Sequence, residues 1–513
     1  MSVAPSAQSR TIGTPFILAL CTAVGIVLVI RPYQWMNDDA YFYLKVALNH
    51  SRGLGSTFSG LAPTNGYHPL WQWMLFGLFD VLKPGVESGL IAARLLCWAV
   101  MTAALMAYLR FACRVFGNPW GAASAALLSI FATRGVSCME FWLQGLLIVL
   151  VLMRVREWGD VDRVRPTGAA VGDGLLLAML VLCRLDTMVF VAWVLVMLVM
   201  RDRQTSGRGA VATRMTGAIV ILSIVAYAFC NAHTFGHAAS ISSLLKSSFP
   251  HPVLPTFTTL LSTKHAWPGW LAAGVLVFLP ARAGERTPNH QIVRLLSAST
   301  LLHAALVLSF TRWPAFGIWY WMLSYLSLAM FVSELGRRWM NASWATLAVI
   351  LAALWNTMAI ADALVRYPDR PEGEMGRQVA AHLPNDAIVF QVDATGMTSY
   401  LSDRTIINGD GLMNNMEYQD ALHGGRLQAY LAKYGVTHIV HDEVEAMGAD
   451  VASGNYRVAR YDVPCHLKGT ATTLELGHDD EIARWTVAWP GQLFPWPRDG
   501  HRQTFVVWQR SNR

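Results

Sequence analysis

Long apolar segments alternate with short polar ones over most of the chain. A membrane-spanning helix needs about 17–25 consecutive, mainly apolar residues, and the shortest segments fall near or below that limit. The pattern predicts a polytopic α-helical membrane protein with about 11 transmembrane helices. The expected spans are 13–30, 88–112, 118–133, 140–157, 170–184, 187–201, 214–231, 267–281, 292–311, 317–335 and 341–361.

Two shorter segments follow the first span. Residues 39–50 place apolar side chains on one side of a helix, and residues 69–82 form a second, largely apolar helical segment. Such helices suit a position flat on a bilayer surface. We therefore expect the first outer loop, residues 31–87, to carry two surface helices.

The pattern changes after about residue 365. Strand-like runs at 387–393, 404–408 and 436–441 alternate with a helical run at 426–434, and the Trp-rich last stretch resembles further strands. Alternating strands and helices predict a small α/β domain. The predicted domains are a membrane domain over 1–364 and a soluble α/β domain over 365–513.

Composition supports the membrane class. The chain is 54% hydrophobic and 14% charged, whereas soluble domains carry about 25% charged residues. The first apolar segment is followed by many more, so it is expected to be a retained anchor and not a cleaved signal peptide. The net charge of +7 comes from Arg residues in short loops, which indicates membrane topology and excludes nucleic acid as the expected partner.

Arg-rich loops set the expected orientation. They occur at every second connection, and such loops are cytoplasmic in bacterial inner-membrane proteins. The N-terminus is therefore expected in the cytoplasm, and an odd number of spans places the C-terminal domain in the periplasm. The Arg residues concerned are 110 and 114; 154, 156, 163 and 165; 201, 203, 208 and 214; 282, 286 and 294; and 337 and 338.

The candidate chemistry collects on the opposite, outer face, beginning with Asp38 and Asp39 directly after the first span. Adjacent carboxylates raise one another's pKa, and a carboxylate at a lipid–water boundary is suited to act as a general base. The alternative is a helix N-cap at Asn37 or Asp38, a role compatible with the first. Placement on the outer face favours function.

Further polar residues share that face, each with a structural alternative. Glu140 opens an apolar helix, where an acid in the first turn is also favourable to the helix dipole. Arg184 and Asp186 occupy one turn and form either a local ion pair or part of a site. His68, next to Tyr67, binds substrate or stabilises a turn.

Lys246 and Arg312 are cations in two outer loops separated by two spans. They are suited to clamp a lipid phosphate, although interfacial snorkelling explains either one alone. The seven cysteines show no metal-binding spacing. Cys138 and Cys183 both lie near outer turns. The sequence leaves open whether they form a disulfide or remain free thiols.

Several strings resemble the GT-C superfamily of membrane glycosyltransferases. The string Asp38-Asp39-Ala-Tyr-Phe-Tyr-Leu-Lys-Val-Ala resembles its acidic signature on the first surface helix. Pro63 to Trp71 resembles the Thr-Asn-Gly-Tyr-His-Pro-Leu-Trp string of a bacterial subfamily and is similar to a string of mycobacterial arabinofuranosyltransferases. Weaker resemblances lie in Ser137-Cys-Met-Glu140, where Cys138 replaces a Gly, in Arg184-Leu-Asp186 and in Asn408-Gly-Asp-Gly-Leu-Met-Asn414.

The resemblance implies an inverting transferase that uses polyprenyl-phosphate-linked sugars and carries an external soluble domain. The acceptor would be a cell-envelope glycan or glycolipid at the periplasmic face. Asp38 would be the base, and Asp39 would orient it or contact the acceptor. The other candidates would bind substrate: Tyr67, His68, Glu140, Arg184 and Asp186, with Lys246 and Arg312 on the departing phosphate. No cofactor is obligatory, although Asp38 and Glu140 would suit a divalent ion, Mg²⁺ or Mn²⁺.

The main alternative is a polytopic transporter or flippase of envelope lipid or polysaccharide with an external sensing domain. A transporter is expected to show repeat symmetry and interrupted helices near the membrane midplane. Here the ionisable residues cluster at outer loops instead, which favours the transferase. An assembly or receptor protein that binds through its tail would leave the paired acids dispensable.

Overall fold

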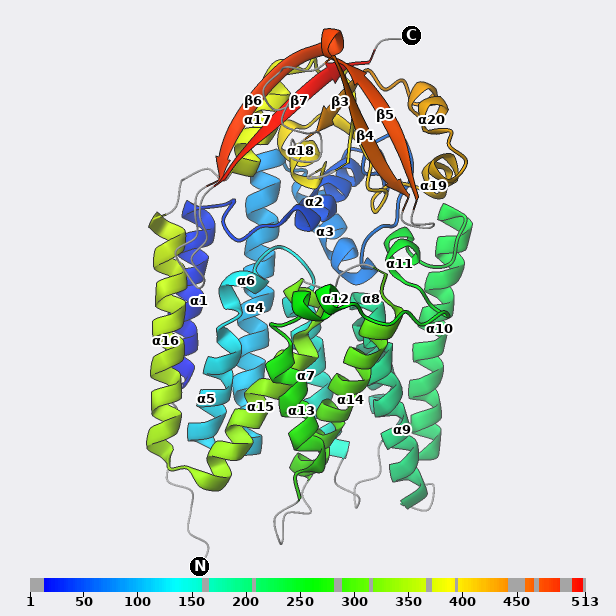
Figure 1. Ribbon diagram of the computed structural model, residues 1–513. Helices are drawn as coiled ribbons and strands as arrows, with labels where there is room; N and C mark the ends of the chain where they lie inside the picture. Colours follow the sequence, from blue (N-terminus) through cyan, green and yellow to red (C-terminus); the bar gives the residue numbers. More distant parts are fainter. Residues whose placement is uncertain are drawn as a thin grey trace, which may run out of the picture.

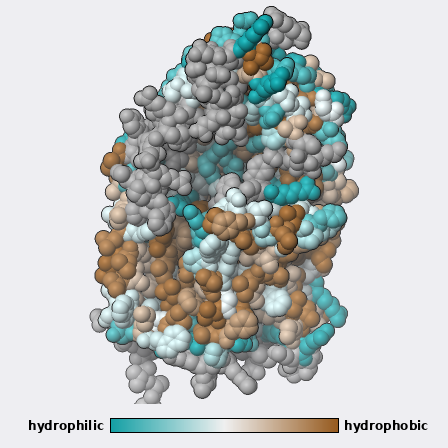
Figure 2. All heavy atoms as spheres, in the orientation of Figure 1, coloured by the Kyte–Doolittle hydropathy of each residue, from teal (hydrophilic) through white to brown (hydrophobic). Residues whose placement is uncertain are grey.

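The structure is a computed structural model that describes residues 13–158, 166–204, 209–280, 288–312, 317–365, 371–392, 395–441, 457–465, 470–489 and 501–510. It consists of a bundle of long helices with a sheet-containing domain at one end (Figure 1). That end is called the domain end below. Apolar side chains cover much of the bundle and polar ones are concentrated toward the domain (Figure 2).

Each of the eleven predicted spans overlaps one of the bundle's main helices. Five of them, α1, α4, α10, α14 and α16, are long and apolar enough to cross a membrane on length and composition, while α8 and α13 are shorter apolar helices. The polytopic membrane fold is confirmed. The bounds are α1 Gly13–Ile30, α4 Val86–Phe116, α5 Asn118–Ser129, α7 Phe141–Trp158, α8 Thr167–Cys183, α9 Met188–Gln204, α10 Ala210–Phe235, α13 Trp267–Phe278, α14 Pro288–Phe310, α15 Met322–Trp339 and α16 Ala342–Val365.

Short helices fill the connections between the main helices. They are α6 Ala132–Gly135, α11 Ile241–Lys246 and α12 Phe257–Ser262, together with the 3₁₀ turns η1 Leu185–Thr187 and η2 Ile318–Tyr320. Helix α1 begins at the end of the bundle away from the C-terminal domain (Figure 1). The Arg-bearing last turns of α4, α7, α9 and α15 belong to connections that the sequence places on the N-terminal side.

The two helices expected in the first outer loop are present as α2, Asp38–Ser51, and α3, Pro69–Leu82. Only α3 keeps an open face, since Trp73 and Val81 are exposed while Trp71 is buried. Helix α2 differs from the expectation of a helix flat on the bilayer, because every residue from 40 to 49 is buried. The C-terminal domain packs on the side of α2 that would otherwise face solvent.

The C-terminal domain is built on a five-stranded sheet of order β2-β1-β3-β7-β6. The first three are parallel, and β7 and β6 add antiparallel. A separate hairpin joins β4 and β5. The strands are β1 Ile388–Gln391, β2 Thr405–Asn408, β3 His438–His441, β4 Val458–Cys465, β5 Thr470–Gly477, β6 Glu481–Trp489 and β7 His501–Gln509; the helices are α17 Pro371–His382, α18 Thr395–Ser402, α19 Met416–His423 and α20 Leu427–Lys433.

The carboxyl ends of β1 and β2 face the membrane bundle. Helix α18 follows β1 and packs on α2, and the loop of residues 409–415 follows β2. A β-carbon on Gly66, in the first outer loop, would lie 1.9 Å from the carbonyl oxygen of Leu412. This close approach requires glycine. Open α/β sheets usually bind ligands at the carboxyl ends of their strands. In this protein that edge of the sheet packs against the domain end of the bundle.

Candidate active site

A cavity of about 620 Å³ lies where the bundle, the first outer loop and the C-terminal domain meet. This volume is within the range of small-molecule sites, about 300–1,000 Å³. The cavity joins most of the sequence candidates. Its lining includes Asp39, Phe42, Tyr43, Gly66, His68, Met139, Arg184, Leu185, Asp186, Met188, Val189, Lys246, His303, Leu306, Val307, Phe310, Trp319, Tyr320, Leu412 and Met413.

The lining combines charged and apolar side chains from different elements. The charged groups come from α2, η1 and α11 and the residues beside them, all outside the main helices. Apolar groups come from α9, through Met188 and Val189, and from α14, through Leu306, Val307 and Phe310. A cavity with this composition suits a molecule that joins a charged head to a hydrocarbon chain.

The two adjacent acids have different environments. Asp39 lines the cavity, whereas the carboxyl oxygens of Asp38 accept hydrogen bonds from the backbone N–H groups of Gly396 at 3.3 Å and Met397 at 2.8 Å. Burial raises the pKa of Asp38 to about 8, against the lowering effect of these two amides. Asn37 makes no side-chain capping bond. Asp38 therefore caps α18 of the distant domain, and the acid that faces the cavity is Asp39.

Arg184 is the centre of a buried charge network. Its guanidinium binds Glu140 through one nitrogen at 2.5 Å and Asp186 through two others at 3.2 and 2.9 Å. It also lies 4.7 Å from the ring centre of Tyr320. Glu140 accepts a further hydrogen bond from the Tyr43 hydroxyl at 3.1 Å. The local Arg184–Asp186 pair is present, and Glu140 is fully buried behind the cavity wall.

Two histidines border this network. His68 Nε2 lies 3.6 Å from a Glu140 oxygen. Burial lowers the pKa of His68 to about 4, because the opposing attraction of Glu140 is smaller, so the imidazole is neutral at neutral pH. His303 Nε2 on α14 lies 3.3 Å from Asp186. This contact joins α14 to the turn η1 between α8 and α9.

Lys246 and Arg312, far apart in sequence, are neighbours in the fold. The Arg312 N–H donates to the Lys246 carbonyl at 2.8 Å, beside a β-bridge between Ser247 and Thr311. Lys246 lines the cavity and Arg312 is exposed outside it. Burial lowers the pKa of Lys246, but Tyr320, Asp39 and Asp410 outweigh it, so the net shift is upward and the ammonium stays charged.

Some site residues were not recognised from the sequence. Tyr320 carries no sequence signal beyond aromatic character. Tyr43 lies within the string that begins at Asp38 but was given no role there, and the string Asn408–Asn414 was the only pointer to Leu412 and Met413. The candidate Tyr67 lies away from this cavity: its hydroxyl is 2.6 Å from that of Ser56, and the residue lines a second cavity between α3 and α10.

Asp38 and Glu140, the two acids expected to suit a divalent ion, do not have oxygens available to bind one. Asp38 uses both oxygens on amides, and Glu140 is bound by Arg184 and Tyr43. In the described ranges no group of three or more His, Cys, Asp or Glu side chains gathers as a metal site requires. The seven cysteines are all free, so Cys138 and Cys183 are not joined.

No protein-family model and no curated protein sequence matches the chain. Among solved structures, ArnT from Cupriavidus metallidurans bound to undecaprenyl phosphate aligns with a TM-score of 0.57 at 13% identity, covering 96% of this chain and 97% of that one. The same protein in the apo state aligns with a TM-score of 0.56 at 12% identity. At this identity the likeness concerns the fold. The likeness to the bacterial subfamily and to arabinofuranosyltransferases stays a prediction, and the chain is a multi-pass membrane protein with the GT-C fold and a C-terminal sheet domain.

Proposed function

We propose that this protein is an inverting glycosyltransferase that moves a sugar from a polyprenyl-phosphate donor to a hydroxyl of an envelope glycan or glycolipid. The observation that carries the proposal is the single cavity that joins the Asp39 carboxylate, the Lys246 ammonium and the apolar walls of α9 and α14. The solved ArnT structure holds undecaprenyl phosphate, and the shared fold supports a donor of this class.

The donor would lie with its isoprenoid chain along α9 and α14 and its phosphate at Lys246. A fixed cation is most useful where negative charge develops, which here is the departing phosphate. Lys246 is charged and faces the cavity, while the exposed Arg312 next to it adds a weaker, solvent-screened attraction at the edge. The sequence assigned phosphate binding to Lys246 and Arg312 equally, whereas the structure favours Lys246 as the main phosphate ligand.

Asp39 would act as the general base in place of Asp38. It would take the proton of the acceptor hydroxyl as that oxygen forms its bond to the sugar C1. The bond between C1 and the phosphate oxygen breaks, and the polyprenyl phosphate leaves with the electron pair toward Lys246. Attack from the side opposite to the leaving group inverts the configuration at C1.

The remaining charged groups would hold the site in shape. Arg184 is paired with Glu140 and Asp186, so it contributes rigidity and little net positive charge. Neutral His68 is suited to a hydrogen bond with a sugar hydroxyl, because its pKa of about 4 keeps it uncharged. Glu140 would act through Arg184 and Tyr43, without touching the substrate.

Replacement of Lys246 by Ala is expected to weaken binding of a sugar-free polyprenyl phosphate. A hydrogen bond to a charged group contributes about 1.5–3 kcal/mol, so the loss should be roughly ten- to a hundredfold. Arg312→Ala should cost less, because the side chain is exposed. Binding is measured on purified protein, with Lys83→Ala, an exposed cation of the first outer loop, as the control. If Lys246→Ala binds as tightly as the parent, the phosphate site lies elsewhere.

The site is proposed to face the periplasm of a bacterial inner membrane, with the N-terminus in the cytoplasm. The basis for this orientation is the alternation of Arg-rich and Arg-poor connections along the chain. Alkaline phosphatase fused after Arg513 should be active, because it folds only when exported, and a fluorescent protein in the same place should stay dark. The reverse result would place the cavity on the cytoplasmic side and remove the proposed donor geometry.

A further inference from the structure

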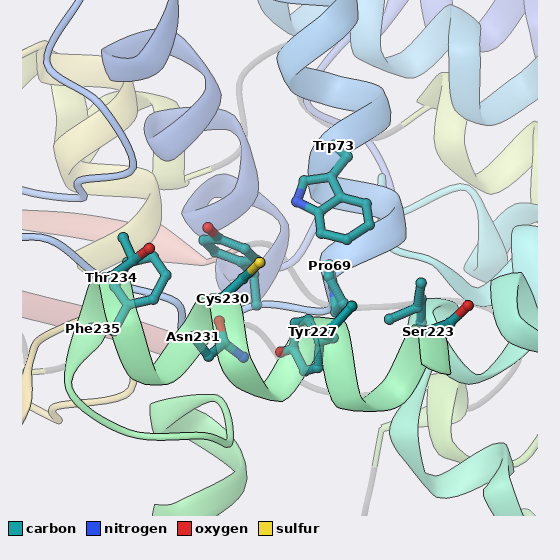
Figure 3. Close-up of a pocket in the computed structure, with 11 residues that line it drawn as sticks. Pro69, Trp73, Ser223, Tyr227, Cys230, Asn231, Thr234 and Phe235 are labelled. Atoms are coloured by element: carbon teal, nitrogen blue, oxygen red, sulfur yellow. The ribbon is translucent and has the colours of Figure 1, made fainter. Parts of the chain in front are cut away.

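A second cavity, of about 410 Å³, lies between α3 and α10. Both helices pack on α8, and the space between them forms what is called the α3–α10 groove. Pro69 and Trp73 from α3 lie across it from Tyr227 and Cys230 of α10 (Figure 3). The groove is lined by Tyr67, Pro69, Trp73, Leu182, Ser223, Ala226, Tyr227, Cys230, Asn231, Thr234 and Phe235.

The groove opens to the surface that the membrane covers. Helix α10 is a candidate span, and the lining residues 223–235 form its half nearest the C-terminal domain. Trp73 is 46% exposed, and Phe229, beside the groove on α10, is 71% exposed. Tryptophan is enriched at the membrane–water interface. A molecule that enters from this side therefore comes from the leaflet next to the domain and brings a hydrocarbon chain.

Polar groups gather toward the domain end of the groove. A smaller cavity of about 200 Å³ adjoins it there and shares Thr234 and Phe235. That cavity is lined mainly by polar side chains and contains no Lys or Arg, and neither does the groove. A head rich in hydroxyl groups matches these partners, whereas a phosphate lacks the cation that Lys246 supplies in the catalytic cavity. The lining is Pro63, Thr64, Asn65, Thr234, Phe235, His237, Asn414, Asn415, Met416 and Glu417.

A single segment of the chain, residues 66–69, separates the groove from the catalytic cavity. Gly66 and His68 line the catalytic cavity, while Tyr67 and Pro69 between and after them line the groove. The segment 66–69 thus presents alternate residues to two different spaces. A lipid held in the groove lies on the opposite side of this segment from the donor chain. Its head can approach the catalytic cavity at the small adjoining cavity, because Asn65 and Asn414 line that cavity while their chain neighbours Gly66 and Met413 line the catalytic one.

We propose that the α3–α10 groove holds the lipid chain of a membrane-anchored acceptor whose uncharged, hydroxyl-bearing head extends through the adjoining cavity toward Asp39. The inference rests on the proposed transferase function and adds the class of acceptor. A bilayer is as apolar as the groove, so burial alone gives the chain little preference. Selectivity therefore comes from packing against Trp73 and Tyr227 and from hydrogen bonds to the head.

Native mass spectrometry in a non-glycosidic detergent tests the groove with three probes: monoglucosyl diacylglycerol, phosphatidylglycerol and polyprenyl phosphate. Ala226→Trp fills the groove and should reduce retention of the neutral glycolipid roughly tenfold or more, a factor that corresponds to about 1.4 kcal/mol. Retention of polyprenyl phosphate should not change, which also shows that the variant is folded. Ala232→Trp, an exposed position of α10 outside the lining, is the matched control.

Labelling of Cys230 gives a second measurement that needs no substitution in the groove. In a Cys113→Ser background, Cys230 is the exposed thiol, since the other five are buried. A maleimide should react with it more slowly when monoglucosyl diacylglycerol is present. Equal protection by phosphatidylglycerol would mean ordinary bilayer lipid, and protection by polyprenyl phosphate would mean a donor groove; either overturns the proposal. Because both readouts are binding, absence of sugar transfer would refute the transferase function without affecting them.

Discussion

Asp39→Asn is expected to slow sugar transfer by about 100- to 10,000-fold, the range typical of a lost general base. Asparagine keeps the size of the side chain and its place in the cavity but does not take up a proton. The carboxylate of Asp39 lines the cavity that holds Lys246, so the loss should fall on the chemical step. Single-turnover transfer from a labelled polyprenyl-phosphate sugar measures it, with binding of the sugar-free lipid as the control for folding.

The matched control is Asp38→Asn, one residue earlier. It should lower the apparent Tm only slightly, because asparagine keeps one of the two oxygens that accept the α18 N–H groups, whereas complete loss of such a cap costs about 0.5–2 kcal/mol. Transfer should fall far less than in Asp39→Asn. If instead Asp38→Asn abolishes turnover at an unchanged Tm while Asp39→Asn remains active, the base is Asp38, as the sequence signature alone suggested.

Arg184→Ala is expected to destabilise the fold by about 3–5 kcal/mol, because it leaves buried acids without their cation. Glu140 is fully buried and Asp186 largely so, and Arg184 bridges them. The apparent Tm of the purified protein measures the effect. Pairing the change with Glu140→Gln should recover part of the loss, since it removes the most buried uncompensated charge.

An exposed ion pair provides the comparison for Arg184. Arg52 binds Asp403 at 2.7 Å, but both side chains are more than a third exposed. Such pairs contribute about 0–1 kcal/mol, so Arg52→Ala should change the Tm little. Equal Tm values for Arg184→Ala and the parent would show that the buried network does not hold the site together.

Local pattern was enough to predict the main helices of the bundle and several elements of the C-terminal domain, but not α17, α18 or α19. The surface helices expected at 39–50 and 69–82 are α2 and α3, and the strand runs at 387–393 and 404–408 contain β1 and β2. Apolar periodicity acts over one or two turns, so it is readable without knowing the neighbours. For the same reason, the pattern did not predict that the outer side of α2 is buried, because that burial depends on packing against the C-terminal domain, which is distant in sequence.

The sequence by itself determined the membrane fold, most of its helices, several strands, and the face on which the polar candidates gather. Only the tertiary structure decided which of them meet a substrate. Adjacent helix residues point about 100° apart, so one of Asp38 and Asp39 faces the cavity, and the choice depends on α18, 358 positions later in the chain. Likewise Glu140 is withdrawn behind Arg184, and a bridge between distant loops brings Lys246 beside Arg312. These pairings are long-range contacts, which no local pattern of residues encodes.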